Sequence, residues 1–352
     1  MSARPPLGSV DARGLAVLGY LGLYLAIAAL LSTALGLKPL LPVEWPTDLY
    51  GLSLVTRPTP LDVGIVGSSR AHYAFLPRAL DACLGAALGR PTRSEAANRV
   101  TASAFAVAAL ARDHFSGDKA PPTLVIEVAP DALNRNHFEL RHNVATTAEW
   151  RDLPACLAEV PATRLRVGDC LSPLARPVSN LAHLLHRPFA ELDHIRWMAL
   201  VEGGGQYCAT HPSCEARNAD YDARHAGRWA TREAAILPRV RSERFADYQI
   251  EGGLGALAFT DLLASRRAAG LATLVINLPV SEAYQREIPP ADYEQFQAWI
   301  HATTEAQGAR YLDWNRGDWT DRQLYLDPDH LNARGAHKAT AALCRALTDA
   351  LH

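Results

Sequence analysis

The segment Leu61-Asp-Val-Gly-Ile-Val-Gly67 runs directly into Ser68-Ser-Arg70. Its β-branched and small apolar residues predict a buried strand, and Gly67 permits a tight turn at the end of that strand. Helical spacing resumes at Pro77, a residue suited to a first helical turn, and continues to Gly89. A strand that passes through a turn into a helix is the opening unit of an α/β sheet.

The same alternation continues along the chain. We expect further buried strands at residues 123–129, 271–279 and 309–313, and helices at about 102–115, 290–306 and 333–350. A long segment with apolar periodicity, from about 240 to 268, precedes the strand at 271–279. Alternating strands and helices imply a parallel sheet with helices on both faces, so the predicted fold class is α/β with three layers.

The overall composition is that of a folded protein. Of the 352 residues, 49% are hydrophobic and 20% are charged, and the formal net charge is −2. A nucleic-acid surface would need a clustered basic excess, so we expect no nucleic-acid partner. The length allows one large α/β domain or two ordinary ones.

An apolar run at residues 14–37 predicts a transmembrane anchor. As a helix, its roughly 24 residues would span about 36 Å, enough to cross a hydrocarbon core of about 30 Å. Because Arg4 and Arg13 precede the run, residues 1–13 are predicted to stay cytoplasmic and the chain after Lys38 to be exported. A cleaved signal peptide, whose apolar core is usually about 7–15 residues, and a buried globular helix are the alternatives.

Two further segments stand apart from the α/β pattern. Residues 38–60 are rich in proline and are predicted to be an extended linker over the membrane surface. Residues 131–235 hold most of the histidines and three adjacent glycines, Gly203–Gly205. We expect a helical and irregular insertion there that caps one end of the sheet, inside a domain that covers residues 61–352.

Cysteine spacing agrees with export. Four of the six cysteines form two closely spaced pairs: Cys156 with Cys170, and Cys208 with Cys214. In an oxidising compartment both pairs could form disulfides, and a loop of about 15 residues contributes about 3 kcal/mol in the chain-entropy model. Spacing alone does not fix the pairing. Cys83 and Cys344 sit in apolar helical patterns and are expected to be core residues.

Ser69 and the C-terminal segment Asp327-Pro-Asp-His330-Leu-Asn-Ala-Arg-Gly335 carry the candidate chemistry. Ligand sites in open parallel sheets lie beyond the carboxyl ends of the strands, and Ser69 lies just past such an end. Asp327 and His330 are three residues apart, so the carboxylate can hold one imidazole nitrogen while the other acts as a base. A serine hydroxyl is a poor nucleophile until such a base takes its proton.

Both segments also have a structural interpretation. Ser68 and Ser69 could simply cap a helix, as serines at strand-to-helix turns often do. Asp329 and Asn332 could cap the last helix, with His330 incidental to that role.

These segments resemble the SGNH, or GDSL-like, hydrolase superfamily. Its first block carries the nucleophile in a Gly-Asp-Ser or Gly-Ser-Ser context, similar to Gly67-Ser68-Ser69, and its last block is Asp-x-x-His, similar to Asp327-Pro-Asp-His330. The longer run to Gly335 looks like that of membrane-anchored members that work beside membrane-bound O-acyltransferases on exported polymers. The resemblance covers about 61–130 and 270–350, and it implies a flavodoxin-like topology, acyl-ester chemistry and a triad of Ser69, His330 and Asp327.

The sequence departs from the family at the oxyanion hole. The family's second block usually has a glycine whose amide helps to form that hole, but Asn98-Arg-Val-Thr-Ala-Ser103 contains none. The backbone amides of Ser69, Ala102 and Ser103 are therefore the candidate donors. The third block, Gly-x-Asn-Asp, is replaced by Glu127-Val-Ala-Pro130, and losing one oxyanion donor typically costs about 10²–10³-fold in rate.

Four other residues are candidates for substrate binding: Arg70, Asn98, Trp314 and Tyr325. The aromatic ones precede the C-terminal motif and could stack on sugar rings, although core packing is an equal alternative. We expect no cofactor and no metal, because Cys208, His211 and Cys214 lack a fourth ligand at ordinary spacing.

The resemblance and the predicted anchor together imply a function. We expect a single-pass protein of the bacterial inner membrane, with an extracytoplasmic domain that transfers an acyl group, acetyl being the first choice, to an exported polysaccharide or envelope polymer. A membrane-bound O-acyltransferase-type protein is the expected partner. An esterase of the same fold and a non-catalytic polymer-binding or scaffold subunit are the alternatives.

Overall fold

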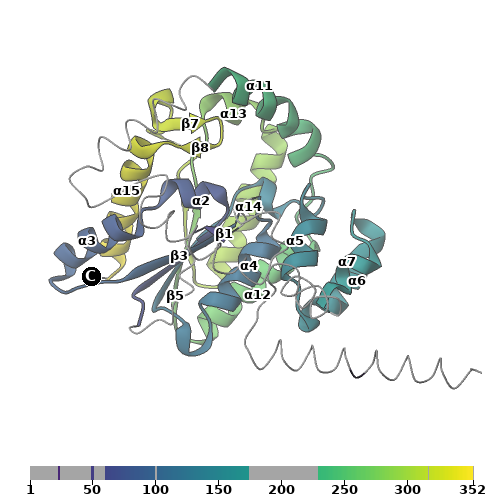
Figure 1. Cartoon of the computed structure of the whole chain (residues 1–352), viewed down its shortest axis with the longest axis horizontal. Helices are drawn as coiled ribbons and strands as arrows, with labels where there is room; N and C mark the ends of the chain where they lie inside the picture. Colours follow the sequence, from purple (N-terminus) through teal and green to yellow (C-terminus); the bar gives the residue numbers. More distant parts are fainter. Residues whose placement is uncertain are drawn as a thin grey trace, which may run out of the picture.

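A sheet of five parallel strands lies at the centre of the part of the chain that is described (Figure 1). The computed structural model describes Leu23, Leu49–Tyr50 and residues 60–99, 101–173, 229–315 and 317–351. In spatial order the parallel strands are β3 (Ser94–Arg99), β2 (Val63–Gly67), β4 (Thr123–Glu127), β5 (Ala272–Asn277) and β6 (Arg310–Asp313). β1 (Leu49–Tyr50), within the predicted linker, pairs antiparallel with the outer edge of β3.

The strand order confirms the predicted α/β class. Numbered by their order in the chain, the parallel strands lie in the order 2-1-3-4-5, which is the flavodoxin-like arrangement of doubly wound sheets. The topological switch point of such a sheet falls between its first and third strands, here β2 and β4. The four strands predicted from apolar runs are confirmed.

Helices cover both faces of the sheet and form two separate cores. One face packs against α4 (Ala104–His114), α12 (Leu254–Ala268) and α14 (Pro290–Ala306), and the other against α2 (Ser69–Ala74), α3 (Pro77–Leu88) and α15 (Ala333–Leu351). Adjacent strand residues alternate between the two cores, as the pleat requires: Ile65 belongs to one and Val66 to the other. The helices predicted from periodicity are therefore confirmed, with small shifts at their ends.

β3 was not predicted, because its sequence, Ser-Glu-Ala-Ala-Asn-Arg, lacks the apolar run of its neighbours. All six of its residues are nevertheless buried, and β3 pairs with β2 along most of its length and with β1 at Asn98 and Arg99. Burial on both faces and pairing along both edges therefore hold a strand that its own residues do not favour.

The described part of the predicted insertion is helical. It consists of η2 (Asp131–Leu133), α5 (Leu140–Thr147), η3 (Trp150–Asp152), α6 (Leu153–Glu159), η4 (Val160–Ala162), α7 (Val167–Cys170) and α11 (Trp229–Arg239). α5 packs on α4, and α6 contacts α12, so this part lies beside one helical layer (Figure 1). α11 contacts β7 (Tyr325–Asp327) and α13 (Glu282–Glu287) instead. The intervening residues 174–228, on which the predicted cap depends, lie outside the described residues.

The predicted membrane anchor lies almost wholly outside the described residues, Leu23 excepted. Within the ranges that are described, none of the helices is both long enough and apolar enough to cross a membrane.

Two disulfides join described parts of the chain. Cys156 is bonded to Cys170, as its spacing allowed. Cys83 is bonded to Cys344, because α3 and α15 are neighbours on one face of the sheet and their cysteines meet although 261 residues separate them. Cys344 is a core residue as expected, whereas Cys83 is exposed on α3, which corrects the expectation for that residue. Cys208 and Cys214 lie outside the described residues.

Replacing both Cys83 and Cys344 by alanine is expected to lower the free energy of unfolding more than replacing Cys156 and Cys170. In the chain-entropy model a cross-link over roughly 260 residues contributes about 5 kcal/mol, against about 3 kcal/mol for a loop of roughly 15. Urea unfolding of each variant would measure the difference. With reductant present, each variant should have the same free energy of unfolding as the reduced wild-type chain. An equal loss of unfolding free energy in the two variants would contradict the prediction.

Candidate active site

Ser68 and Ser69 have different structural roles at the turn after β2. The hydroxyl of Ser68 caps α2, accepting a hydrogen bond from the backbone N–H of Arg70 at 3.1 Å. Ser68 therefore fulfils the capping role that the sequence allowed for either serine. Ser69 is the first residue of α2, so its side chain is free to face the carboxyl edge of the sheet.

A hairpin brings the C-terminal motif to the same edge. β7 pairs antiparallel with β8 (His330–Leu331), and the buried side chain of Leu331 joins the core under α2 and α15. Asn332 ends the hairpin, because its Oδ1 accepts a hydrogen bond from the N–H of Gly335 at 3.0 Å in the first turn of α15. The capping expected of Asn332 is thus present beside His330, not in place of it.

Ser69, His330 and Asp327 form one continuous relay. The Oγ of Ser69 lies 2.9 Å from Nε2 of His330, and Nδ1 of His330 lies 2.8 Å from Oδ1 of Asp327. An ionised carboxylate can only accept, so Nδ1 donates its proton to Asp327 and leaves Nε2 to accept from the serine hydroxyl. Each distance is within the range for proton transfer.

The local charges favour ionised Asp327 and a basic His330. Burial opposes ionisation of Asp327, but the His330 ring and the Arg232 guanidinium hold the pKa of that carboxyl well below its usual range. Burial also opposes charging of His330, but the carboxylates of Asp329 and Asp327 raise the pKa of the imidazole above its ordinary value. The ring is therefore a stronger base than a solvated histidine.

Arg232, on α11, also contacts the relay. It lies 95 residues before Asp327, and neither of the two sequence motifs includes it. Its guanidinium donates to Oδ2 of Asp327, the oxygen that His330 does not use. The side chain of Arg232 is 34% exposed, whereas that of Asp327 is 2% exposed. The last helix of the insertion thus contacts the acid of the relay from the solvent side.

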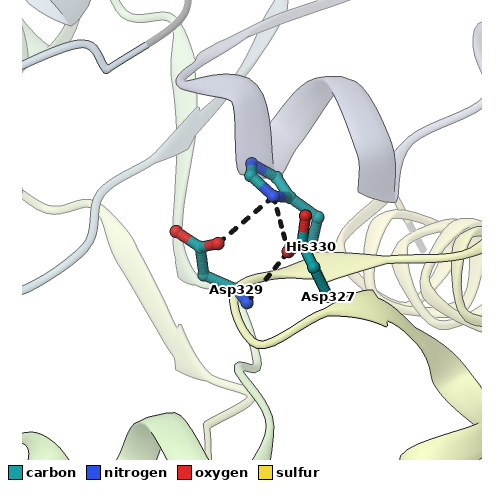
Figure 2. A group of neighbouring side chains, drawn as sticks. All are labelled: Asp327, Asp329 and His330. Carbon is teal, nitrogen blue, oxygen red and sulfur yellow. Dashed lines mark hydrogen bonds and ion pairs between the residues drawn. The ribbon is translucent and has the colours of Figure 1, made fainter. Parts of the chain in front are cut away.

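A buried ionic cluster supports the other side of the ring. Asp329 places Oδ1 at 3.2 Å from Nδ1 of His330 (Figure 2), and its Oδ2 accepts from Arg244 at 2.9 Å. Arg70 donates to Asp131 at 3.1 Å and to the hydroxyl of Tyr284 at 2.7 Å. Burial opposes ionisation of Asp131, but Arg70 and Arg244 lower the pKa of this carboxyl below its usual value.

Glu127 lies against the turn between β2 and α2, which holds Ser68. At the carboxyl end of β4, it accepts a hydrogen bond from the N–H of Ser68 at 2.6 Å. The side chain is buried, which raises the pKa of Glu127 and favours its uncharged form. A Cβ at Gly67 would lie 2.7 Å from the Cβ of Glu127 and 2.6 Å from that of Ala71, so only glycine allows this close approach.

The candidate oxyanion donors are not equivalent. The amide of Ser69 is at the first position of α2, where a helix has no internal partner for an N–H. The amide of Ser103 donates instead to Oδ1 of Asn143 at 3.2 Å, which removes it from the set. Asn143 also donates to the carbonyl of Thr101 at 3.2 Å and so fixes the turn around Ala102. Ser69 and Ala102 remain the predicted donors.

The four residues predicted to bind substrate are mostly turned inward. Arg70 is buried in the ionic cluster, and Asn98 is buried where β3 pairs with β2 and β1. Tyr325 is buried, and its hydroxyl donates to the carbonyl of Trp319 at 2.6 Å, with the carbonyl of Val280 at 3.1 Å. The half-buried ring of Trp314 stacks on Trp319 and meets Phe75 edge-on. The contacts of these four residues are packing and ionic contacts within the protein. They favour a role in holding the site in place over direct contact with substrate.

Asp327, Asp329 and His330 place ligand-type atoms within 4.8 Å of one another, the spacing that a metal ion could bridge. Their donor atoms are already engaged: Nε2 of His330 by Ser69, and one oxygen of each carboxylate by an arginine. A cation here would lie beside guanidinium groups and would replace the Nδ1 proton. This donor set fits a proton relay better than a metal site.

Several residues of the site were not predicted, namely Asp329 as a ring contact, Arg232, Arg244, Glu127, Asp131, Tyr284 and Asn143. Asp329 alone had a sequence signal, its place inside the C-terminal motif. Comparison with protein-family models gives no match for this chain, and comparison with curated proteins gives none either. The interpretation of the site therefore rests on its geometry and on the motif resemblance.

Gly67→Ala is expected to lower the free energy of unfolding by about 1–3 kcal/mol, because its Cβ would overpack the turn against Ala71 and Glu127. Gly168→Ala in α7 is the matched control, since a Cβ there meets no atom within 4 Å. Chemical denaturation of both variants would measure the effect. A Gly67→Ala variant as stable as the control would contradict the packing argument.

Arg232→Gln is expected to move the acid limb of Ser69 reactivity to higher pH. Protonated His330 cannot accept the serine proton, so reactivity rises as the ring loses its proton, at a midpoint above the ordinary histidine value of 6.5. Removing the guanidinium leaves more of the Asp327 charge to stabilise the imidazolium, which raises the pKa of His330 further. Fluorophosphonate labelling rates against pH would measure the midpoint.

Arg239→Gln is the matched control for this experiment. Arg239 lies on the same helix and pairs with Glu243 at the surface, away from the relay. Its variant should keep the wild-type midpoint, and a shift of equal size in both variants would contradict a specific role for Arg232.

Proposed function

We propose that this chain is a membrane-anchored, SGNH-like serine acyltransferase that acts outside the cytoplasm, transferring an acyl group to an exported polysaccharide or envelope polymer. The observation that carries the proposal is the contact between Ser69 and His330 at 2.9 Å, which joins segments 261 residues apart. His330 has a serine hydroxyl at one ring nitrogen and a buried carboxylate at the other, which is the arrangement of a Ser-His-Asp triad.

In the proposed first half-reaction the Oγ of Ser69 attacks the carbonyl carbon of an acyl donor. His330 takes the serine proton on Nε2, and Asp327 stabilises the resulting imidazolium at Nδ1. The negative oxygen of the tetrahedral intermediate is stabilised by backbone amides, with Ser69 and Ala102 as the candidate donors. When the intermediate collapses, His330 returns the proton to the leaving group and the acyl group stays on Ser69.

The second half-reaction repeats these steps with a hydroxyl of the acceptor. His330 removes the hydroxyl proton, the acceptor oxygen attacks the acyl-serine, and Ser69 regains its proton as the ester forms on the acceptor. If water takes the place of the acceptor, the same residues catalyse hydrolysis, which is the esterase alternative. Exclusion of water from the site therefore decides between transfer and hydrolysis.

The choice of transfer, acetyl and polymer depends on the motif resemblance and the predicted anchor. The apolar run at 14–37 supports a place at the inner membrane, with residues 61–352 on the extracytoplasmic side. The disulfides support an oxidising compartment. A membrane-bound O-acyltransferase-type protein is the proposed partner, since it could supply acyl groups across the membrane.

Ser69→Ala is expected to abolish fluorophosphonate labelling and to reduce acyl transfer by at least about 10⁴-fold, because the nucleophile is lost. A radiolabelled acetyl ester, supplied with polymer acceptor, would show the product: label on the polymer indicates transfer, and free labelled acetate indicates hydrolysis. Polymer acylation in cells that carry each variant provides the second measurement.

Ser68→Ala is the matched control, since it removes the neighbouring hydroxyl and costs the helix cap about 1 kcal/mol without removing the nucleophile. It should still be labelled. Full transfer by a folded Ser69→Ala variant would contradict the proposal. A folded wild-type chain that resists labelling would favour the non-catalytic scaffold.

A further inference from the structure

Asp329 carries a buried carboxylate oxygen without a hydrogen bond in the described part of the chain, directly beside the ring of His330. Its side chain is only 3% exposed, and Oδ2 accepts the hydrogen bond from Arg244, but the buried Oδ1 has no hydrogen-bond partner among the described residues. That oxygen lies 3.2 Å from Nδ1 of His330, the same nitrogen that donates to Asp327 (Figure 2). A buried oxygen without a hydrogen bond is costly, so its position beside a reactive ring requires an explanation.

We propose that Asp329 is a second positioning carboxylate for His330, sharing the imidazolium at Nδ1 with Asp327. When Ser69 gives its proton to Nε2, the ring becomes positively charged and lies between two carboxylate oxygens, at 2.8 Å and 3.2 Å. A small rotation of the ring moves the Nδ1 proton from one acceptor toward the other. The inference rests on the proposed serine-dependent function of the same site.

The backbone of the β7–β8 hairpin places the carboxylates of Asp327 and Asp329 beside the same nitrogen, Nδ1 of His330. An irregularity in the register between β7 and β8 falls between Tyr325 and Asp327, and such bulges redirect the side chains beside them. The N–H of Asp329 also donates to Oδ1 of Asp327 at 3.2 Å, which holds the two carboxylates in a fixed relation. The arrangement is therefore built into the hairpin and does not depend on a flexible side chain.

Each carboxylate has its own counter-charge. Asp327 pairs with Arg232 from the solvent side. Asp329 pairs with Arg244 at 2.9 Å and lies 3.9 Å from Arg70 on the buried side. Two carboxylates next to each other would otherwise repel, and each arginine offsets the charge of the carboxylate with which it pairs.

The helices and strands of the site carry other charged and titratable groups, and among the described residues only Asp327 and Asp329 form a hydrogen bond or ion pair with Nδ1 of His330. The other groups are Arg70, His72 and Tyr73 on α2, Glu127 on β4, Asp131 on η2, Arg232 on α11, Arg244 on the π-helical turn η5 (Val240–Arg244), Tyr284 on α13, and Arg334, His337 and Lys338 on α15. The ring of Tyr73 contacts that of His330 at 4.8 Å between centroids. Arg334 and Lys338 donate to Gln323 and Asp318, respectively.

Asp329→Asn is the first test, with Asp131→Asn as its matched control. Asp131 belongs to the same ionic cluster and pairs with Arg70, but it is Asp329 that touches the ring. Loss of a carboxylate at Nδ1 should move the titration midpoint of His330, followed by NMR of the ring, to lower pH. The pH midpoint of fluorophosphonate labelling should shift in the same direction. A midpoint unchanged in Asp329→Asn, or moved equally in Asp131→Asn, overturns the proposal.

Asp327→Asn gives a second test in which Asp329 stays intact, so the outcome does not depend on the folding of Asp329→Asn. With Asp329 still supporting the ring, the labelling rate should fall by less than the roughly 10⁴-fold that loss of a sole triad acid costs. Adding Asp329→Asn should slow labelling at least about tenfold more. A single Asp327→Asn variant that already shows the full 10⁴-fold loss overturns the proposal.

The two readouts separate the two proposals. NMR titration needs no chemistry at Ser69, so a ring midpoint that shifts in Asp329→Asn while wild-type Ser69 resists labelling would refute the serine function and support the paired carboxylates. If wild-type Ser69 is labelled normally but the His330 midpoint does not shift in Asp329→Asn, the serine function is supported and the role of Asp329 is refuted.

Discussion

The hydrogen bond between Ser69 and His330 is the constraint on which the rest of the site depends, because it joins the two ends of one domain. The parallel sheet supplies one partner: β2 ends at the topological switch point, where β4 also ends, and the turn into α2 presents Ser69 there. The β7–β8 hairpin supplies the other, since pairing of these short strands places His330 over α2. Glycine at position 67 is required for this approach, because Glu127 and Ala71 occupy the space that a side chain would need.

Buried charge is arranged in compensated pairs around that hydrogen bond. Asp327 is matched by Arg232, and Asp329 by Arg244, so the imidazole lies between acids whose charge is already balanced. Removing one member of the more buried pair, Arg244 or Asp329, is expected to cost about 3–5 kcal/mol, because the remaining charge is left in a low-dielectric environment. The pair of Arg232 and Asp327 contributes less, because Arg232 is 34% exposed and solvent screens its charge. The cluster is therefore important for folding as well as for the basicity of His330. Through the pair of Arg232 and Asp327, it also connects α11, at the end of the insertion, to the relay of Ser69, His330 and Asp327.

Much of the fold could be predicted from the sequence, because four strands and their helices carry clear apolar periodicity. β3 could not, since polar and small residues such as Ser94 and Asn98 become buried only through their neighbours in the sheet. The relay was predictable from two short motifs, whereas Arg232 and Arg244 approach from helices whose sequences contain no motif. The side-chain contacts of Arg70 could not be predicted either: the residue after Ser69 on a helix points about 100° away from it, here into the ionic cluster.

The Cys83–Cys344 bond joins, by a covalent link, the same two parts of the chain that the contact between Ser69 and His330 brings together. Cys83 follows Ser69 on the chain and Cys344 follows His330, and each pair of partners is separated by 261 residues. The polypeptide between the two cysteines is thereby a closed ring. A protease that cuts one peptide bond within this ring, including anywhere in the long insertion, opens the loop without releasing a fragment. Ser69 and His330 therefore remain parts of a single molecule after such a nick, and only cleavage combined with reduction separates them.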